Sequence, residues 1–448
     1  MLINDKIKQL NNIAVPLIIQ SISGLIIGLT DQMLIGRISI FAYSSVGIIM
    51  SLLFFLAGII GFLAVEFNIL GSKSIGENKY EDFEDHLTSS ILLNSMIGIL
   101  FFGIIIFFGR IILEVFYDFS GELLNVALKY FNIMSLYMII QLLIFTFSSY
   151  FKVIKKTKYI LVSSLIASIL NVILDYILIF GKLGLPSMGI VGAGISSIFS
   201  MSINLLIYIY IARKHIKFSY KKVHKYFSNM KIQLIESIPL MGQELLEGSI
   251  FVIFINAILA RIGIIELTSY LLVIQFINII LMPMYMYGSA TLTLVSETFE
   301  SSNKKSLTTF TKEGIKISFI IYLFLGLILI LFRNYLPKVI SNNMDVINFS
   351  SKLIVIMVII NLINPIQTIC KYSLQACGQS KFVLYATSIV NILIFILISI
   401  LVLFLKIGML GLFIGLFLNY CILVIVYYKK IQKLYSIKHI ENDTCINN

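Results

Sequence analysis

Long apolar runs dominate this 448-residue sequence and constrain its fold more than any other feature. Segments 13–35 and 384–405 each carry at most one charged residue. At about 1.5 Å of rise per helical residue, runs of this length span the ~30 Å hydrocarbon core of a bilayer. Charged residues make up only 12% of the chain, about half of what a soluble domain needs on its surface. We therefore expect an all-α membrane protein.

The alternation of apolar runs with polar interruptions predicts twelve transmembrane helices in two groups of six. The predicted spans of the first group are 13–36, 43–70, 87–109, 126–150, 160–181 and 189–212. Those of the second group are 232–260, 268–296, 314–333, 348–376, 384–405 and 409–428.

The positions of the basic residues predict the orientation of these helices. With the amino terminus inside, the cytoplasmic segments and adjoining helix ends hold roughly three quarters of the 34 Lys and Arg residues. We therefore expect a multi-pass protein of a bacterial inner (plasma) membrane with both termini in the cytoplasm. The net charge of +12 then faces anionic headgroups and requires no nucleic-acid partner. Segment 213–231 holds seven Lys or Arg and no acid, and is interpreted as a solvated cytoplasmic linker.

The two groups of helices resemble each other weakly, which predicts an internal repeat. Pro16 begins helix one and Pro239 begins helix seven, each within a similar apolar tripeptide. The offset stays near 223 residues, and six helices per copy give both copies the same orientation. We expect two six-helix bundles related by a pseudo-two-fold axis along the membrane normal. The expected division is an N-lobe at 1–212, a linker at 213–231, a C-lobe at 232–428 and a cytoplasmic tail at 429–448.

Three carboxylates lie deepest within the predicted spans: Asp31, Asp175 and Glu247. Each costs roughly 2.5–3.5 kcal/mol at the bilayer centre, so each is expected to face protein or water and to bind something. They lie ~22–27 Å from the cytoplasmic start of helices that all run outward, at a similar depth beyond the midplane. No Lys or Arg lies in the middle of a predicted span to neutralise them.

The first two acids have polar neighbours that together form a candidate ion site. Asn171 precedes Asp175 by one helical turn and shares its face. Ser196 and Ser197 begin helix six at a similar height, beside a glycine-rich segment that permits close helix approach. Such a set of oxygens can coordinate Na⁺ at Asp31, Asn171 and Asp175, or the two carboxyl groups can share a proton. A purely structural pairing of the acids with polar neighbours is the alternative.

A second polar turn is predicted in helix seven, where Gln243, Glu244 and Glu247 lie within reach of one another. This turn is a candidate site for an ion or a cationic substrate. Helix eight contributes thioethers and an aromatic ring suited to hydrophobic cations, although such residues more often pack against neighbours or lipid. These candidate substrate contacts are Met282, Met284, Tyr285 and Met286.

These residues resemble those of the MATE (multidrug and toxic compound extrusion) family, in the superfamily that includes lipid-linked oligosaccharide flippases. The resemblance is carried by Pro16 with Asp31 fifteen residues on, and by the stretch from Asn171 and Asp175 through the glycines of 181–194. It extends over roughly residues 10–430. It implies two six-helix bundles, alternating access, and drug export driven by H⁺ or Na⁺.

The resemblance also implies roles for individual residues. The family's amino-lobe cation site corresponds to Asp31, Asn171 and Asp175, and its helix-one proline, associated with bending, corresponds to Pro16. Some members add a helix-seven Glu and a helix-ten Asp. Glu247 resembles the first, but Asn364 stands at the second position, which favours the amino-lobe mechanism.

Two other functions compete with a cation/drug antiporter. A flippase for a lipid-linked oligosaccharide would carry basic residues in its cavity or two extra helices, and neither is found in the sequence. A membrane enzyme would need an embedded nucleophile and base, yet no histidine lies inside a predicted span. We expect no cofactor besides the coupling ion, small hydrophobic cations and lipids as partners, and a monomer.

Overall fold

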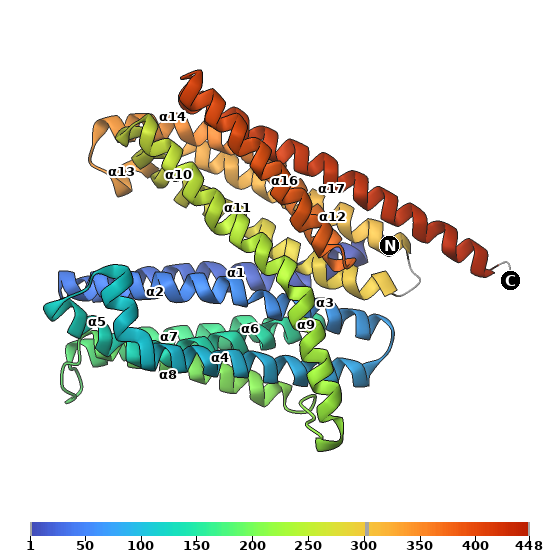
Figure 1. The fold of residues 1–448 in the computed structure, drawn as a ribbon, viewed down its shortest axis with the longest axis horizontal. Coiled ribbons are helices and arrows are strands. Elements are labelled where there is room, and N and C mark those ends of the chain that lie inside the picture. The colour runs from blue at the N-terminus through green and yellow to red at the C-terminus, as the bar shows by residue number, and fades with distance from the viewer. Residues whose placement is uncertain (1, 301–303, 447–448) are drawn as a thin grey trace. The chain divides into compact units, whose positions relative to one another are not determined.

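The computed structural model describes residues 2–300 and 304–446, with side chains described for 4–299 and 306–435. The regular secondary structure of the described residues is helical (Figure 1). Twelve helices or helix pairs within them are long and apolar enough to cross a membrane. The prediction of an all-α protein with twelve transmembrane helices is therefore confirmed.

The helices form two compact units, each described here by itself. The first comprises Val15–Ser237, and the second combines the residues up to Ala14 with those from Ile238 onward. Both boundaries fall inside a helix and just before a proline, Pro16 in one case and Pro239 in the other. The units thus divide the chain at other points than the expected lobes: the start of the first helix belongs to the second unit, and the basic segment 213–231 to the first.

The first unit packs around an apolar core that includes Ile49, Leu53, Phe131, Met138 and Leu142. A 3₁₀ turn joins α5 to α6, so that these two helices form one span. The helices are most of α1 (Leu2–Gly36), α2 (Ile40–Ile60), α3 (Phe62–Gly76), α4 (Tyr80–Tyr117), α5 (Gly121–Ile133), α6 (Tyr137–Val153), α7 (Lys158–Phe180), α8 (Ile190–Ala212) and the first part of α9 (Val223–Glu244).

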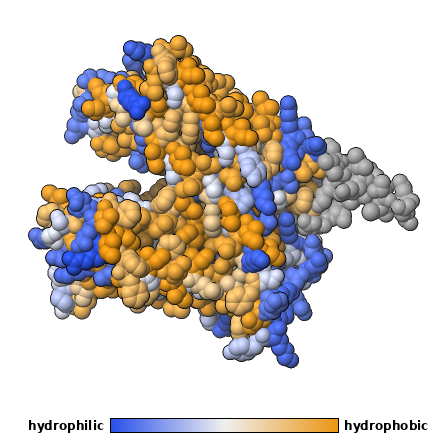
Figure 2. All heavy atoms as spheres, in the orientation of Figure 1, coloured by the Kyte–Doolittle hydropathy of each residue, from blue (hydrophilic) through white to orange (hydrophobic). Residues whose placement is uncertain are grey.

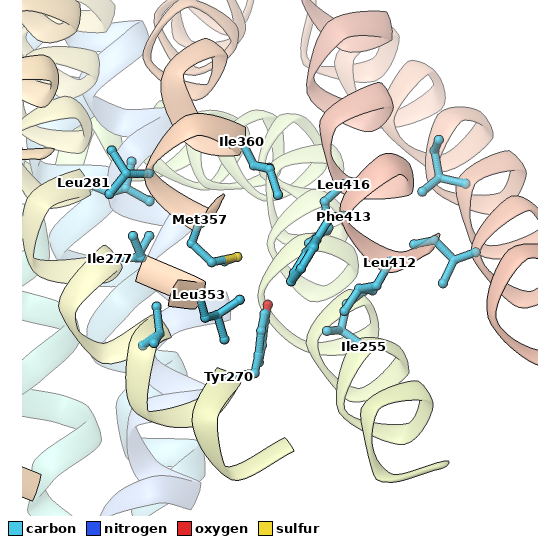
Figure 3. Packing of buried hydrophobic residues seen from close by; sticks show 14 of the residues in the cluster. Ile255, Tyr270, Ile277, Leu281, Leu353, Met357, Ile360, Leu412, Phe413 and Leu416 are labelled. Atoms are coloured by element: carbon cyan, nitrogen blue, oxygen red, sulfur yellow. The ribbon is translucent and has the colours of Figure 1, made fainter. Parts of the chain in front are cut away.

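The second unit has its own apolar core. In Figure 3, Leu353 and Met357 lie between Ile277 on one side and Phe413 on the other. Its further helices are a π-helical turn (Leu245–Ile250), α10 (Phe251–Ile262), α11 (Ile264–Glu300), α12 (Lys304–Leu331), α13 (Leu336–Ile340), α14 (Met344–Ile360), α15 (Asn364–Ala376), α16 (Ser380–Ser399), a second π-helical turn (Ile400–Phe404) and α17 (Met409–Ile446).

Proline interrupts one of these spans and leaves others continuous. Between α14 and α15 the chain passes through a 3₁₀ turn, Asn361–Ile363, and Pro365 occupies the first turn of α15. Proline has no N–H and its ring clashes with the preceding turn, so it starts a helix readily and interrupts one that has already begun. Pro16 and Pro283 instead lie inside the continuous helices α1 and α11.

Large apolar side chains cover the outer faces of the helices. Figure 2 shows them over the middle of the helices of both units, with hydrophilic residues gathered near the helix ends. Phe107 of α4 is 78% exposed, and Phe324 of α12 and Leu393 of α16 are also exposed. Apolar surface of this extent is stable only in contact with lipid.

The predicted basic linker is partly helical and packs onto α4. A 3₁₀ turn at Tyr220–Lys222 leads into α9, which begins at Val223. Lys222 Nζ lies 3.1 Å from both carboxylate oxygens of Asp85, and Lys225 Nζ lies 2.7 Å from Asp85 Oδ2. This part of 213–231 is therefore helical where a loop was expected, and its Lys222 and Lys225 side chains, 38% and 45% exposed, pair with an acidic residue of the first unit.

Candidate functional site

The first unit brings Asp175 and Ser196 together through a close packing of α7 against α8. A Cβ on Gly192 of α8 would lie 2.8 Å from the backbone carbonyl of Leu178 on α7, so only glycine permits this approach. Asp175 and Ser196 are then buried opposite each other, with Asp175 only 1% exposed, and the Ser196 hydroxyl donates to Asp175 Oδ1. The glycine-rich segment thus permits the close approach of two helices, as predicted.

Asp31 of α1 completes a cluster with α7. The Asn171 amide, with its nitrogen directed toward Asp31, donates to Oδ2 at 3.1 Å and to Oδ1 at 3.3 Å. This orientation is assigned from the hydrogen-bond partners, because the opposite one would set the amide oxygen against the carboxylate. The carboxyl group of Asp31 also lies within hydrogen-bonding contact of Asp175. The expected set of Asp31, Asn171, Asp175 and Ser196 therefore meets in one place.

Within the described residues, no basic side chain supplies a counter-charge to this cluster. Among the described residues, no Lys or Arg acts on the Asp31 and Asp175 carboxyl groups. Two carboxyl groups that touch in a buried setting repel each other when both are ionised, and a proton or a cation between them removes the repulsion. The arrangement is therefore suited chemically to hold either one.

Two further residues belong to this region that the sequence did not single out. Tyr130 of α5 is buried beside Gly194 and interacts electrostatically with both carboxyl groups. Ser200 lies one turn beyond Ser196 on α8, and its buried hydroxyl has no hydrogen-bond partner among the described residues. The four-residue spacing from Ser196 could have indicated Ser200. Ser197 points about 100° away from Ser196 and is only half-buried.

The second unit gathers a different polar cluster around Glu247. Glu247 lies in the π-helical turn Leu245–Ile250, and Gln243 donates to its Oε1 at 3.2 Å. Lys371 of α15 donates to Glu247 Oε2 at 2.7 Å. Gln375, one turn after Lys371, donates to Gln243 Oε1 at 2.8 Å. The expectation that no basic residue neutralises the buried acids is therefore wrong for Glu247.

Asn364 belongs to a separate set of contacts. Its amide donates to Asn361 Oδ1 at 3.1 Å, and Thr368 donates to its oxygen at 3.1 Å. Within the described part of the chain, the partners of Glu247 are Gln243 and Lys371 instead. Lys371 lies seven residues, or about 10 Å along the helix, after Asn364.

The four candidate substrate contacts of α11 differ in exposure. Met284 is buried in the apolar core of the second unit, and Met282 and Met286 are half-buried. Tyr285 is 40% exposed and interacts electrostatically with Lys371 and Glu247. Tyr285 is thus the most exposed member of this group.

Comparison with known proteins agrees with this arrangement. The MatE family model matches twice, at residues 16–177 and 239–401, so the two matches begin at Pro16 and Pro239 and lie 223 residues apart (239 − 16). This confirms the predicted internal repeat. The probable multidrug resistance protein NorM of Thermotoga maritima is 21% identical over 83% of this chain and 80% of its own length. The probable multidrug resistance protein NorM of Oceanobacillus iheyensis is 26% identical over 81% of this chain and 82% of its own length.

Solved structures show the same fold. A mutant of the Vibrio cholerae MATE transporter VcmN superposes with a TM-score of 0.85 at 19% identity, covering 97% of this chain and 99% of the other. An outward-facing multidrug resistance MATE transporter of the MOP superfamily gives 0.84 at 16% identity, with 97% of each chain covered. The two matches of the family model span well over half of the sequence, and the chain therefore belongs to the MATE family of multidrug efflux transporters.

Proposed function

We propose that this protein exports organic cations in exchange for an inward flow of H⁺ or Na⁺, and that the Asp31–Asp175 cluster is the coupling site. The observation that carries the proposal is the contact between the buried carboxyl group of Asp175 and the half-buried one of Asp31, on which no described basic side chain acts. A coupling ion must bind and leave in every cycle. Carboxyl groups without a resident counter-charge give it a place to do so.

The position of the cluster on α1 supports a route from ion binding to movement. Asp31 lies in the part of α1 that belongs to the first unit, whereas the residues up to Ala14 of the same helix belong to the second. Pro16 follows this boundary directly and removes one backbone hydrogen bond from the helix. Neutralising Asp31 and Asp175 would change the packing of α1 on α7 and bend α1 at Pro16.

The energetics are adequate for such a cycle. In a cytoplasmic membrane with both termini inside, an inside-negative potential contributes ~2.3 kcal/mol per elementary charge per 100 mV to ions that move inward. Exchange of one inward H⁺ or Na⁺ for one monovalent organic cation moves no net charge, so at that stoichiometry the concentration gradient of the ion alone drives export. Each additional inward ion adds the contribution of the potential, roughly a 50-fold accumulation per 100 mV.

The test is ethidium efflux from cells that express the protein, with and without Na⁺ and with a protonophore. The proposal predicts efflux that follows one ion gradient, and its loss in Asp31→Asn at matched membrane insertion. Normal efflux by Asp31→Asn would contradict the coupling role. Absence of efflux of any dye by the unmodified protein would instead favour a lipid-linked oligosaccharide flippase.

A further inference from the structure

The second unit contains a polar group of five side chains within its membrane-spanning helices, here called the Glu–Lys cluster: Gln243, Glu244, Glu247, Lys371 and Gln375. We infer that Lys371 is a specificity-determining residue, which limits this cluster to cargo with a single positive charge. The inference rests on the proposed function, because it takes organic cations as the cargo. Neither the internal repeat nor the ion-coupling site accounts for the presence of Lys371 in this cluster.

The ion pair at the centre of the cluster is short and partly exposed. Lys371 Nζ lies 2.7 Å from Glu247 Oε2, and the two side chains are 13% and 27% exposed, respectively. Gln243 holds the other oxygen of Glu247 at 3.2 Å. Glu247 also lies in a π-helical turn, a local widening of the helix that occurs frequently at functional sites.

A buried acceptor in the cluster lacks a donor. Gln375 is 2% exposed, and its amide nitrogen donates to Gln243 at 2.8 Å. Its Oε1 has no hydrogen-bond partner among the described residues. A buried polar atom of this kind costs free energy unless a donor meets it. An amino group on a bound ligand would supply that donor next to the ion pair.

The charges of the cluster do not cancel. Glu244 lies one turn before Gly248, whose missing side chain leaves room for Glu244 Oε1. Lys371 interacts electrostatically with Glu244 as well as with Glu247. When both carboxyl groups are ionised, they and the single ammonium of Lys371 leave a net charge of −1, which one monovalent cation neutralises. A second positive charge would remain uncompensated in a setting of low dielectric constant, where unpaired charge is strongly unfavourable.

Aromatic rings beside the charges suit a planar cation. Lys371 Nζ lies 5.8 Å from the ring centroid of Tyr372, and Tyr285 is exposed in the same electrostatic neighbourhood. The ring of Tyr372 packs against Gly288 of α11, which fixes its position. An aromatic cation can therefore rest on the face of Tyr285 while its charge meets the carboxylates.

Ethidium and propidium provide the test, because they share one phenanthridinium ring and carry one and two positive charges, respectively. Binding of each dye to the purified full-length protein is followed by fluorescence. The unmodified protein should bind ethidium at least about 10-fold more tightly than propidium. Lys371→Met makes the cluster −2 and should shift this ratio toward propidium by about 10-fold or more. Lys381→Met, which removes an exposed lysine of α16, should leave the ratio unchanged.

Two further variants separate the charge of the cluster from its shape. Glu244→Gln makes the cluster neutral and should weaken ethidium binding about 10-fold. The double variant Glu247→Gln with Lys371→Met restores a charge of −1 and should restore the original ratio. It also keeps the test valid if Lys371→Met alone fails to fold.

An unchanged ratio in folded Lys371→Met, or ethidium binding that does not respond to Glu244→Gln, would overturn the inference while leaving the proposed function intact. If the unmodified protein binds neither dye, organic cations are not its cargo, and the proposed function fails together with the inference.

Discussion

The two units of this transporter share one sequence repeat but differ in the partners of their acidic side chains. In the first unit Asp31 and Asp175 touch, and no described basic side chain acts on them. In the second unit Glu247 is paired with Lys371 at 2.7 Å. The same fold thus holds two acids without a described basic partner in the first unit and pairs Glu247 with a lysine in the second. We therefore propose a division of functions, in which the first unit binds the coupling ion and the second unit binds the cargo.

The second unit also lacks the counterpart of the first unit's acid. The repeat offset of 223 residues carries Asp175 onto Ile398, which is fully buried among apolar side chains. Ser196 corresponds to Asn419, which donates to Asn391 at 2.8 Å. Asn391 lies seven residues before Ile398, so two neutral amides join α16 to α17 at a different height from the hydroxyl and the carboxyl group that join α7 to α8.

The largest expected effect is that of Asp175→Asn. This substitution leaves Asp31 without its acidic partner, while the new amide oxygen can still accept from Ser196. We therefore expect ion-driven efflux to fall at least about 100-fold, as for other groups essential to a step. Transport assays in proteoliposomes measure this. Glu247→Gln is the matched control in the other unit, and efflux by this variant should still depend on the ion gradient. If both variants lose this dependence equally, the proposed distinction between the units is wrong.

A smaller effect is expected at the α7–α8 contact. Gly192→Ala places a Cβ about 2.8 Å from the backbone of Leu178, which must push the helices apart and cost about 1–3 kcal/mol of stability. The melting temperature in detergent measures the loss, and efflux should fall with it because Ser196 moves away from Asp175. Gly28→Ala, where nothing lies within 4 Å, should be neutral. Equal stability of both variants would contradict the close packing.

The basic segment 213–231 is attached to the first unit through Asp85, so removing this carboxylate should lower the stability of the protein. Asp85 is 2% exposed and accepts from Lys222 and Lys225, so Asp85→Asn should cost about 1–3 kcal/mol. Asp82 also pairs with Lys225, at 2.8 Å, but its side chain is 40% exposed, and Asp82→Asn should cost less than about 1 kcal/mol. Thermal unfolding compares the two. A larger effect at Asp82 would contradict Asp85 as the main contact of the basic segment with α4.

The smallest expected effect concerns the amide pair of the second unit. Replacing Asn391 and Asn419 together with Leu removes both partners of one hydrogen bond, so stability should change by less than about 1 kcal/mol. The ion dependence of efflux should not change. A shift in the coupling ion or in its affinity would show that the second unit also takes part in coupling.

The sequence predicted the fold well because hydropathy reports directly on the apolar middle of each helix. It underestimated helix length where the ends are polar: α4 runs from Tyr80 to Tyr117, against the predicted span 87–109. Pro365 marked a real interruption, whereas α1 and α11 continue through Pro16 and Pro283. Whether a proline breaks a helix depends on the packing of its neighbours, which a linear sequence does not specify.

The candidate site could be predicted as far as its residues share a helix face or a depth in the membrane. The one-turn spacing of Asn171 and Asp175 and the similar depth of Asp31 indicated that they meet, as the structure has them. Lys371 was missed because it lies near the end of an apolar span, where a lysine normally reaches the headgroups. Its turn toward Glu247 follows from the packing of α15, and the π-helical turn at Glu247 has no sequence signal that we recognise.

The division of functions between the units is tested most directly by ion-driven ethidium transport in proteoliposomes under an imposed Na⁺ or pH gradient. Asp31→Asn and Glu247→Gln are compared at equal protein content. We predict that Asp31→Asn abolishes the response to the gradient, while Glu247→Gln alters ethidium affinity and still responds to the ion. A response that persists in Asp31→Asn and disappears in Glu247→Gln would contradict the account.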